Sequence, residues 1–424
     1  MSDAQGADAQ PARTAYLATH YPALSHSFIL REVQAVRREG VEVSTYTVRR
    51  SPRADMRTPA MEAEDAATPA ILGAGVAQWV GAHARLLRRS PKALLGSLGR
   101  AARSGPPTPK GKVWQLFYLA ESVVLHDQLQ AEGIRHVHSH HANGAADVAR
   151  LTADLGNRID GDGTWSWSLT MHGSTEFDDV KLHDLPAKAR DAVAISAISD
   201  YCRAQVIRHL PPDTWDKVSI ARMSVDAATF APPATPRSHD GPLRVVTVGR
   251  LHPVKGFPIL VDAVADLKDA GVDVELRLVG QGDLEEALRR QIQERGVADR
   301  VTLTGALGEE GIVEQLHWAD AYVCSSFTEG LPVVLMESMA TQCATISTHI
   351  AAVPELITDG VSGLIVAPGR VDELADALRR LAADPQLRRR LGEAGREAVL
   401  REFTTDTAGP AKAAFLRDAA GPVS

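Results

Sequence analysis

The sequence predicts an α/β protein of two domains, each built around a parallel β-sheet with helices on its faces. The chain has 424 residues, 44% of them apolar, which is enough for two cores of about 200 residues each. From residue 243 onward, short apolar segments alternate with helical patterns, and this rhythm is typical of parallel strands joined by right-handed crossovers. Residues 230–242, FAPPATPRSHDGP, have the proline content and polarity of a linker between domains.

The first half of the chain opens with a βαβ pattern. A strand over 14–22, a helix over 27–40 and a strand over 41–49 make up this unit. Residues 51–70 are rich in proline, alanine and acids and are predicted to form a surface loop, whereas residues 71–131 are predicted to be helical with a break near 104–111. The remaining predicted elements are a strand over 134–142, a helix over 147–156, strands over 166–173 and 192–199, a helix over 201–209 and a closing segment over 217–226.

The second half repeats one strand–helix pair after another. Strands are predicted at LRVVTVG (243–249), VELRLVG (274–280), VTLTG (301–305), AYVCSS (321–326), ATIST (344–348) and GLIVA (363–367), with helices beginning near residues 256, 283, 310, 332, 353 and 371. Residues 385–400 and the tail to 424 are predicted to form C-terminal helices.

Composition excludes several classes of protein. The net charge is −7, with 27 Lys and Arg against 26 Asp and Glu in residues 1–240 and 19 against 27 in the rest, a balance that disfavours general nucleic-acid binding. Cys202, Cys324 and Cys343 are too few and too scattered for a disulfide framework, which indicates a reducing, cytoplasmic setting. The polar N-terminus lacks the apolar segment of a signal peptide, and no apolar run reaches the roughly 18 residues of a membrane span.

Residues 66–120 contain basic residues but no acidic ones. Among their Leu, Val and Ala residues lie Arg85, Arg88, Arg89, Lys92, Arg100, Arg103, Lys110 and Lys112. One interpretation is a basic amphipathic surface for an anionic lipid leaflet, at the inner face of a membrane, or for a lipid-diphosphate acceptor. The other is a helical insertion whose charged face is simply solvated.

Two glutamates, Glu329 and Glu337, flank Gly330-Leu331-Pro332 in SSFTEGLPVVLMESMA. Pro332 is a suitable first helical residue, because its missing N–H would be unsatisfied there. Glu337 then lies on the second turn, and the two carboxylates are expected about 10 Å or more apart. That separation exceeds the roughly 5–9.5 Å of a hydrolase's acid–base pair. It suits two anchors for one extended ligand, with the helix N-terminus between them open to an anion.

This segment, together with the following ATISTHIAAVPELITDGVSGLIVAPG, resembles the C-terminal signature of the retaining glycosyltransferases of family GT4. Residues 243–366 follow that family's order of motifs. The resemblance implies the GT-B architecture, in which two Rossmann-like domains face each other across a cleft and C-terminal helices follow. It implies an acceptor-binding domain over residues 1–232, a nucleotide-sugar-binding domain over 242–405 and a tail over 406–424 that returns to the first domain.

Arg250 and Lys255, in VGRLHPVKGFP, match the family's diphosphate-binding pair. A transferase that breaks a sugar–phosphate bond must stabilise the negative charge that grows on the leaving diphosphate, and Arg and Lys suit that task. The resemblance implies that no metal is needed. We therefore expect no cofactor other than a nucleoside-diphosphate sugar as co-substrate.

The same resemblance assigns the donor contacts. Glu329 is expected to accept hydrogen bonds from hydroxyls of the donor sugar, and Glu337 from the ribose. Gly330, Leu331 and Val333 are expected to offer backbone N–H groups to sugar and phosphate. Glu329 could instead shield positive charge on the anomeric carbon, and the sequence leaves both roles open.

Gly280 and Gly282 belong to a strand-to-helix turn, VGQGD, that lacks the full dinucleotide fingerprint, so bound NAD is disfavoured. In the family this loop runs beside the nucleotide; a plain tight turn is the alternative. His172, in SLTMHGSTEF, ends a strand of the first domain, where the family carries a histidine close to the donor sugar. We count it with the catalytic residues Arg250, Lys255 and Glu329.

The segments YPALSHSFILREVQAVRREG and HVHSHHANGAADVA resemble the branch of the family that builds exopolysaccharides such as colanic acid, although His26 replaces an acidic residue there. On this resemblance Ser25, His26, His141 and Asn143 are expected on the acceptor side. Metal ligation by the nearby histidines is the alternative, because alternate residues of a strand share a face. It would use His136, His138, His140 and His141, but no cysteine or carboxylate cluster completes such a set.

The expected function is transfer of a sugar from a nucleoside-diphosphate sugar to an acceptor, with retention and without a metal. A lipid-linked saccharide is the acceptor that the resemblance suggests, and a small-molecule or secondary-metabolite hydroxyl or thiol is the second choice. A non-catalytic module that binds sugar nucleotides is a different class, and intact Arg250, Lys255, Glu329 and Glu337 speak against it. A nucleotide-sugar epimerase is a third, but its carboxylate acid–base groups cannot be placed.

Overall fold

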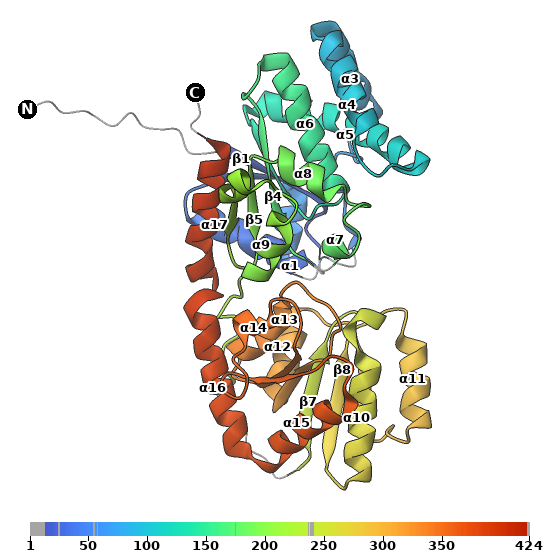
Figure 1. Cartoon of the computed structure of the whole chain (residues 1–424), viewed down its shortest axis with the longest axis vertical. Coiled ribbons are helices and arrows are strands. Elements are labelled where there is room, and N and C mark those ends of the chain that lie inside the picture. The colour runs from blue at the N-terminus through green and yellow to red at the C-terminus, as the bar shows by residue number, and fades with distance from the viewer. Residues whose placement is uncertain are drawn as a thin grey trace, which may run out of the picture. The chain divides into compact units, whose positions relative to one another are not determined.

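The computed structural model describes residues 13–23, 26–53, 56, 58–173, 175–235, 237 and 241–421. The chain forms two compact units; in Figure 1 the first is coloured from blue to green, with the dark red α17 added to it, and the second from yellow to red. The first unit comprises the residues up to 222 together with those from 409 onward, and the second comprises residues 223–408. Residues 223–232, assigned above to the first domain, thus belong to the second unit.

The first unit is built on a sheet of six parallel strands in the order β2-β1-β3-β4-β5-β6. These strands are β1 (Arg13–His20), β2 (Glu42–Arg49), β3 (His136–His140), β4 (Ser166–Met171), β5 (Ala194–Ala197) and β6 (Val218–Ile220). Because the order reverses between β1 and β3, the carboxyl ends of these two neighbours form the usual ligand position of such a sheet. His138 of β3 lies opposite both Tyr16 and Ser168 in the register, so polar side chains run through the middle of this sheet.

Helices cover both faces of the first sheet. They are α1 (Ser27–Arg38), α2 (Pro59–Ala67), α3 (Val76–Arg89), α4 (Pro91–Arg103), α5 (Pro109–Glu132), α6 (Gly144–Asp160), α7 (Thr175–Asp178), α8 (Leu185–Asp191), α9 (Asp200–Ile207), the 3-10 helix η3 (Pro212–Lys217) and, from residue 409, α17 (Thr405–Ala420). Ile29, Val33 and Val36 of α1 share one buried cluster with Phe415 and Leu416 of α17, so the C-terminal helix completes the core of the first unit.

The predicted loop over residues 51–70 is wrong in its second half, which forms α2. The side chain of Thr58 caps this helix by accepting a hydrogen bond from the backbone N–H of Met61 at 3.2 Å, and Pro59 occupies the first turn. Met61 and Glu64 are the buried residues of this helix. A high proline content is typical of loops, but here Pro59 directly follows the capping Thr58 and starts a helix.

The predicted helical segment over 71–131 is confirmed, with its break between α4 and α5 (Figure 1). Ser90 caps α4 and Thr108 caps α5, each through its side-chain oxygen. α4 and α5 pack against α6, which itself contacts β1, β3 and β4. The three helices α3–α5 therefore form an outer layer over α6.

The second unit has a sheet of six parallel strands in the order β12-β11-β10-β7-β8-β9. These are β7 (Leu243–Val248), β8 (Val274–Val279), β9 (Val301–Gly305), β10 (Ala321–Cys324), β11 (Ala344–Thr348) and β12 (Leu364–Val366). The order reverses between β7 and β10, which places the ligand position of this sheet at the ends of those two strands. The predicted alternation of strands and helices is confirmed in every pair.

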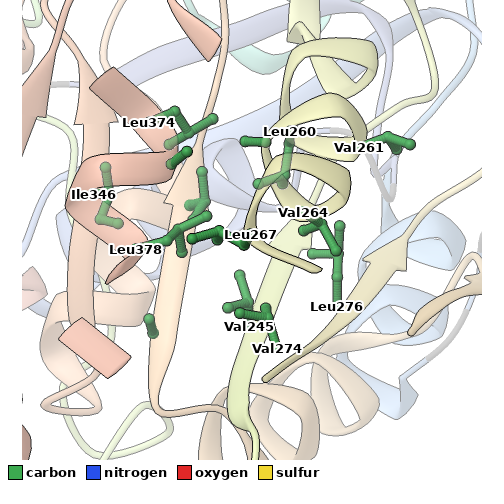
Figure 2. Packing of buried hydrophobic residues seen from close by; sticks show 14 of the residues in the cluster. Val245, Leu260, Val261, Val264, Leu267, Val274, Leu276, Ile346, Leu374 and Leu378 are labelled. Carbon is green, nitrogen blue, oxygen red and sulfur yellow. The ribbon is translucent and has the colours of Figure 1, made fainter. Parts of the chain in front are cut away.

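The helices of the second unit are η4 (Pro253–Lys255), α10 (Phe257–Asp269), α11 (Glu285–Glu294), α12 (Glu309–Trp318), α13 (Val333–Ala340), α14 (Val353–Leu356), α15 (Val371–Ala383) and α16 (Pro385–Glu402). Figure 2 shows how α10 and α15 bury Leu260, Val264 and Leu378 against the strands. No helix among the described residues is long and apolar enough to cross a bilayer.

Candidate functional site

The loop after β7 is held against the loop after β10 by its backbone. Gly256 has φ +64°, and a Cβ there would lie 2.1 Å from the carbonyl oxygen of Ser325, so only glycine allows this approach. The N–H of Phe327 donates to the carbonyl of Val254 at 2.8 Å, and the hydroxyl of Ser325 donates to the carbonyl of Lys255 at 3.0 Å. The side chain of Lys255 is thereby directed to the second loop.

Lys255 and Glu329 form an ion pair across these two loops. The Lys255 Nζ lies 2.5 Å from Glu329 Oε1, and the hydroxyl of Ser326 donates to the same oxygen at 2.7 Å. Their side chains are 27% and 14% exposed, so the pair lies at the surface of the unit without being fully solvated. Among the described residues nothing donates to Glu329 Oε2, which leaves that oxygen open to the hydroxyl of a ligand.

Arg250 lies on the same loop as Lys255 and is exposed, with no carboxylate partner among the described residues. Gly280 and Gly282 allow this loop to approach the turn after β8. A Cβ at Gly280 would lie 1.9 Å from the carbonyl oxygen of Gly249, and one at Gly282 would lie 2.5 Å from that of Leu251. The structure therefore gives both glycines a packing role; their contact with a ligand stays a prediction.

The helix α13 begins at Val333, one residue later than predicted. Pro332 is its N-cap residue with an extended ψ of 121°, so it precedes the first turn instead of opening it. Leu335 donates its N–H to the carbonyl of Pro332 at 3.2 Å, whereas the N–H of Val333 has no acceptor among the described residues. Gly330 and Leu331 are buried immediately before this helix end. A helix N-terminus of this kind attracts an anion.

Glu337 lies on the second turn of α13, as predicted, and is buried. The pKa of Tyr322 on β10 is raised well above its usual value, first by burial and then by the negative groups near it, including both Glu329 and Glu337. The carboxylates of Glu329 and Glu337 therefore both contribute to the raised pKa of Tyr322.

In the first unit, three imidazoles gather at the ends of β3 and β4. The ring of His172 lies 4.3 Å from that of His141, and His141 lies 5.5 Å from His26. Phe28 packs on His172 at 4.9 Å. One nitrogen of each histidine is buried without a hydrogen-bond partner among the described residues: His26 Nδ1, His141 Nε2 and His172 Nδ1. Buried polar atoms without partners are costly, which marks this cluster as a place for a polar ligand.

A buried chain of polar groups leads from His172 into the core. His172 Nε2 lies 2.9 Å from His140 Nδ1, and His140 Nε2 lies 3.3 Å from Glu32 Oε1. The same carboxylate oxygen accepts a hydrogen bond from the hydroxyl of Tyr16 at 2.8 Å and lies 3.2 Å from Lys412 Nζ. We call Glu32, His140, His172 and Lys412 the buried relay.

The relay fixes the proton on each ring nitrogen. Burial alone would raise the pKa of Glu32, but Lys412, His140 and Tyr16 lower it to about 2, so Glu32 is an ionised acceptor. The carboxylate 3.3 Å from His140 Nε2 favours the tautomer that carries its proton on Nε2, and His140 Nδ1 then accepts from His172 Nε2–H. Burial and the neighbouring histidines lower the pKa of His172 well below its usual value, so this ring is neutral. His172 Nδ1 is therefore an acceptor.

The metal alternative does not fit this cluster. Glu32, His138 and His140 have atoms close enough to share an ion. However, both ring nitrogens of His138 are within 2.9 Å of the hydroxyls of Ser168 and Thr170, and the ammonium of Lys412 already lies beside Glu32. The arrangement suits a buried ammonium group.

The remaining acceptor-side residues have structural contacts. Asn143 caps α6, accepting from the N–H of Ala145 at 3.0 Å, and His141 adopts φ +66°. Ser25 lies outside the described residues. Glu176 holds the loop ends together, because its carboxylate accepts hydrogen bonds from the backbone N–H groups of Ala142, His172 and Gly173.

The comparisons with known proteins agree with this geometry. Residues 233–398 match the family described as glycosyl transferases group 1. The chain is 31% identical to alpha-D-kanosaminyltransferase of Streptomyces kanamyceticus over 59% of its own length and 68% of that protein. The chain belongs to the group 1 glycosyl transferases. The GT4 resemblance is thereby confirmed.

Other relatives of this glycosyl transferase match over shorter lengths. It is 34% identical to a putative colanic acid biosynthesis glycosyltransferase of Escherichia coli, over 41% of this chain and 43% of that one. It therefore spans less than half of this second relative. Sucrose-phosphate synthase of Thermosynechococcus elongatus superposes with a TM-score of 0.71 at 19% identity, covering 96% of this chain and 98% of that one. Anabaena HepE, solved with UDP and glucose, superposes with a TM-score of 0.70 at 15% identity, covering 95% of this chain and 98% of that one. These structures confirm the GT-B fold.

Three charged residues around the histidine cluster of this glycosyl transferase were not predicted from the sequence: Glu32, Glu176 and Lys412. Two of them carry a signal that could have been used. Glu32 interrupts the apolar face of a predicted helix that also holds Ile29 and Val33, and Lys412 stands in the apolar run AKAAFL. A charge on an otherwise buried helical face requires a partner, although the sequence cannot say which one.

The glycosyl transferase is expected to lose stability as the pH falls from about 7 to 5. Burial lowers the pKa of His136 to about 3 and lowers those of His138, His140 and His172, whereas the unfolded chain protonates them near 6.5. The unfolded state then binds more protons, so the free energy of unfolding decreases, by up to about 1.4 kcal/mol per pH unit for each histidine. Guanidinium unfolding followed by tryptophan fluorescence measures this decrease.

Five of the six tryptophans, Trp79, Trp114, Trp165, Trp167 and Trp215, belong to the first unit and report its unfolding. The variant His138→Gln should reduce the pH slope by about one proton. A slope that is zero in the wild type, or unchanged in the variant, would contradict the neutral buried histidines.

Breaking the buried ion pair should destabilise the glycosyl transferase more than replacing it. Lys412→Met is expected to cost up to about 3 kcal/mol of unfolding free energy, because Glu32, only 16% exposed, then lacks its ammonium partner. The double variant Glu32→Gln/Lys412→Met should recover most of that loss. Denaturant titration of the three proteins tests this order, with Arg289→Met, from an exposed pair with Glu285, as a control that changes less than about 1 kcal/mol.

Proposed function

We propose that this group 1 glycosyl transferase moves a sugar from a nucleoside-diphosphate sugar to an acceptor hydroxyl, with retention and without a metal. The observation that carries the proposal is the Lys255–Glu329 pair at the position where the order of the second sheet reverses. A cation and a carboxylate with one open oxygen stand there beside the N-terminus of α13. Such a site can bind a diphosphate and a sugar at the same time.

Positive charge on the loop after β7 stabilises the leaving group. Arg250 is exposed and can bind a phosphate through its planar guanidinium, while Lys255 supplies a compact charge. The N–H of Val333 adds a donor at the positive end of the helix dipole. Together they stabilise the charge that develops on the diphosphate as the bond to the anomeric carbon breaks.

The two glutamates hold the flanking sugars. Glu329 already accepts from Lys255 and Ser326 through Oε1, so its Oε2 accepts from a hydroxyl of the transferred sugar. Glu337 accepts from the ribose. In the first unit, His172 Nδ1 accepts a hydrogen bond from a sugar hydroxyl, because the buried relay places the ring proton on Nε2.

Retention follows if transfer occurs on one face of the sugar and the leaving phosphate takes the acceptor proton. The carboxylate assigned to the transferred sugar, Glu329, is ion-paired with Lys255, which makes it a poor nucleophile. Neither the relay nor the Lys255–Glu329 pair requires a metal to balance its charge.

A lipid-linked saccharide is the acceptor we favour. A relative in Mycolicibacterium smegmatis, 29% identical over 53% of this chain and 62% of its own, is named as a phosphatidylinositol monomannoside mannosyltransferase. The amylovoran and colanic acid relatives carry names of exopolysaccharide biosynthesis. A small-molecule acceptor is the second candidate, favoured by the kanosaminyltransferase, the relative that the chain covers most completely of those compared.

Lys255→Ala and Glu329→Ala should each lower kcat by about 10²–10³-fold or more while leaving the fold intact. Both side chains lie at the surface of the unit and outside its apolar core. Release of nucleoside diphosphate, measured with a panel of donors and acceptors, reports the transfer. Unfolding midpoints close to that of the wild type would show that both variants are folded.

The matched control is Lys268→Ala, which removes a half-buried lysine that pairs with Asp299 in the same unit, and it should keep wild-type turnover. Transfer should also persist in excess EDTA. Near-normal turnover by either site variant would overturn the site, and loss of turnover in EDTA would overturn metal independence.

Nucleoside diphosphates should raise the melting temperature, since a ligand that binds only the folded state stabilises it. A screen of UDP, GDP and dTDP identifies the base. Glu337→Gln should reduce the ligand-induced shift, because a tenfold loss of affinity removes about 1.4 kcal/mol of stabilisation. The control is Glu310→Gln at an exposed position on α12, and its ligand-induced rise in melting temperature should equal that of the wild type. Ligand-induced shifts without any release of nucleotide would favour the non-catalytic alternative.

A further inference from the structure

The outer helices of the first unit expose an unusual amount of apolar surface. Sixteen large apolar side chains are exposed in the described chain, and ten of them lie between residues 72 and 117. They are Leu72, Val76, Val80, Leu87, Leu95, Leu98, Val113, Trp114, Leu116 and Phe117. Val76 is 81% exposed, Leu95 67% and Phe117 56%. Single exposed apolar residues are common in monomers, but a concentration of this size marks an interaction surface.

These side chains follow helical spacing. On α3 the exposed positions Val76, Val80 and Leu87 repeat every one or two turns, and on α4 Leu95 and Leu98 are three apart. On α5 the positions are Val113, Leu116 and Phe117. Each of the three helices therefore has a second apolar face in addition to its buried one.

The buried faces of these helices use other residues. They are Ala82 and Leu86 on α3, Ala93, Ser97 and Ala101 on α4, and, in the first turns of α5, Gly111, Gln115 and Leu119. The exposed side chains thus contribute nothing to the core of the unit. The helices α3, α4 and α5 contact one another, so their outer faces belong to one layer of the unit (Figure 1).

Residues 66–120 of this layer carry eight cations and no carboxylate, and its acids, Glu121, Asp127 and Glu132, lie in the later turns of α5. Three of its eight cations pair with carboxylates of other elements: Arg85 with Asp127, Arg89 with Asp160, and Arg100 with Asp154 and Asp191. Lys112 donates to the carbonyl of Ser104. Four exposed cations have no carboxylate partner among the described residues: Arg88, Lys92, Arg103 and Lys110. Arg88 and Lys92 flank the turn between α3 and α4, next to Leu87 and Leu95.

We propose that α3–α5 dock this glycosyl transferase on the anionic surface of a lipid bilayer. The docking surface consists of the ten apolar residues above together with Arg88, Lys92, Arg103 and Lys110. Apolar side chains of a basic amphipathic helix enter the boundary between headgroups and acyl chains. Each unpaired Lys or Arg near an anionic leaflet adds about 1 kcal/mol. Trp114 can hold its ring at the interface, as amphipathic aromatics do.

A second copy of the chain is a poorer occupant of this surface. A symmetric dimer would place the same patch of each subunit in contact, which brings the cations of both copies together. A bilayer that contains acidic phospholipids offers apolar volume and negative charge at once. The proposal uses residues of the first unit alone, so it is independent of the donor site around Lys255.

Sedimentation with vesicles tests the proposal on the full chain. At about 0.1 M salt, the protein should bind vesicles of phosphatidylcholine with 30% phosphatidylglycerol and bind pure phosphatidylcholine at least tenfold more weakly, with binding to the anionic vesicles decreasing as salt rises. Arg88→Glu/Lys92→Glu should weaken binding to the anionic vesicles at least tenfold. Leu95→Ser/Phe117→Ser should do the same, and should reduce the binding that remains at high salt.

The matched controls lie in the second unit. Arg389→Glu/Arg401→Glu makes the same change of charge at exposed positions, and Val361→Ser/Leu400→Ser removes two exposed apolar side chains. Both controls should bind as the wild type does, and all four variants should keep its melting temperature, because the altered side chains are exposed.

Three results would overturn the docking surface. One is that neither type of vesicle binds; another is that the docking variants bind as the controls do. The third is a dimer, seen by light scattering, that the docking variants dissociate, which would assign the surface to a second copy. Failure of the proposed function looks different, since vesicle binding would persist in a protein that releases no nucleotide.

Discussion

In a parallel sheet every strand ends at the same edge, and this constraint places the polar residues of both units. In the second unit β7 and β10 are neighbours although more than 70 residues separate them, so the loops after them meet and bring Lys255 to Glu329. In the first unit β1, β3 and β4 are neighbours. Their ends bring together Glu32 of the following helix α1 with His140 and His172. Each site is thus a consequence of strand order more than of local sequence.

The two ion pairs at these edges differ in the cost of desolvation. Lys255 and Glu329 keep contact with water, so the pair can open when a ligand brings its own charge. Lys412 is only 3% exposed, against 27% for Lys255, whereas Glu32 and Glu329 are exposed to a similar degree, 16% and 14%. Burial lowers the pKa of Lys412, and only Glu32 opposes that shift. A buried pair of this kind contributes little net stability, but it specifies geometry, because any displacement leaves a charge unpaired. The first pair suits exchange with a ligand, and the second suits a fixed support behind His172.

The helices and strands, which depend on local sequence patterns, could be predicted from the sequence. Contacts between residues far apart along the chain could not. The strand–helix alternation, the helical segment 71–131 and the position of Glu337 on the second turn of its helix follow from periodicity, and all are confirmed. The helix α2 was missed because its composition resembles a loop, although Thr58 and Pro59 form a cap. The contact of Lys412 with Glu32 joins residues 380 positions apart, and the local sequence around either residue does not predict its partner. The roles of the site residues toward ligands stay predictions.

The C-terminal helix α17 influences the ligand position of the first unit through the tautomer of His172. Lys412 is the largest of the influences that lower the pKa of Glu32, and a Glu32 that became protonated could donate to His140 Nε2 instead of accepting from it. The proton on each following nitrogen would then reverse, and His172 Nδ1 would become a donor. The ammonium of Lys412 on α17 thereby favours the tautomer in which His172 Nδ1 accepts a hydrogen bond. A helix that completes the core of the first unit also sets the polarity of its ligand position.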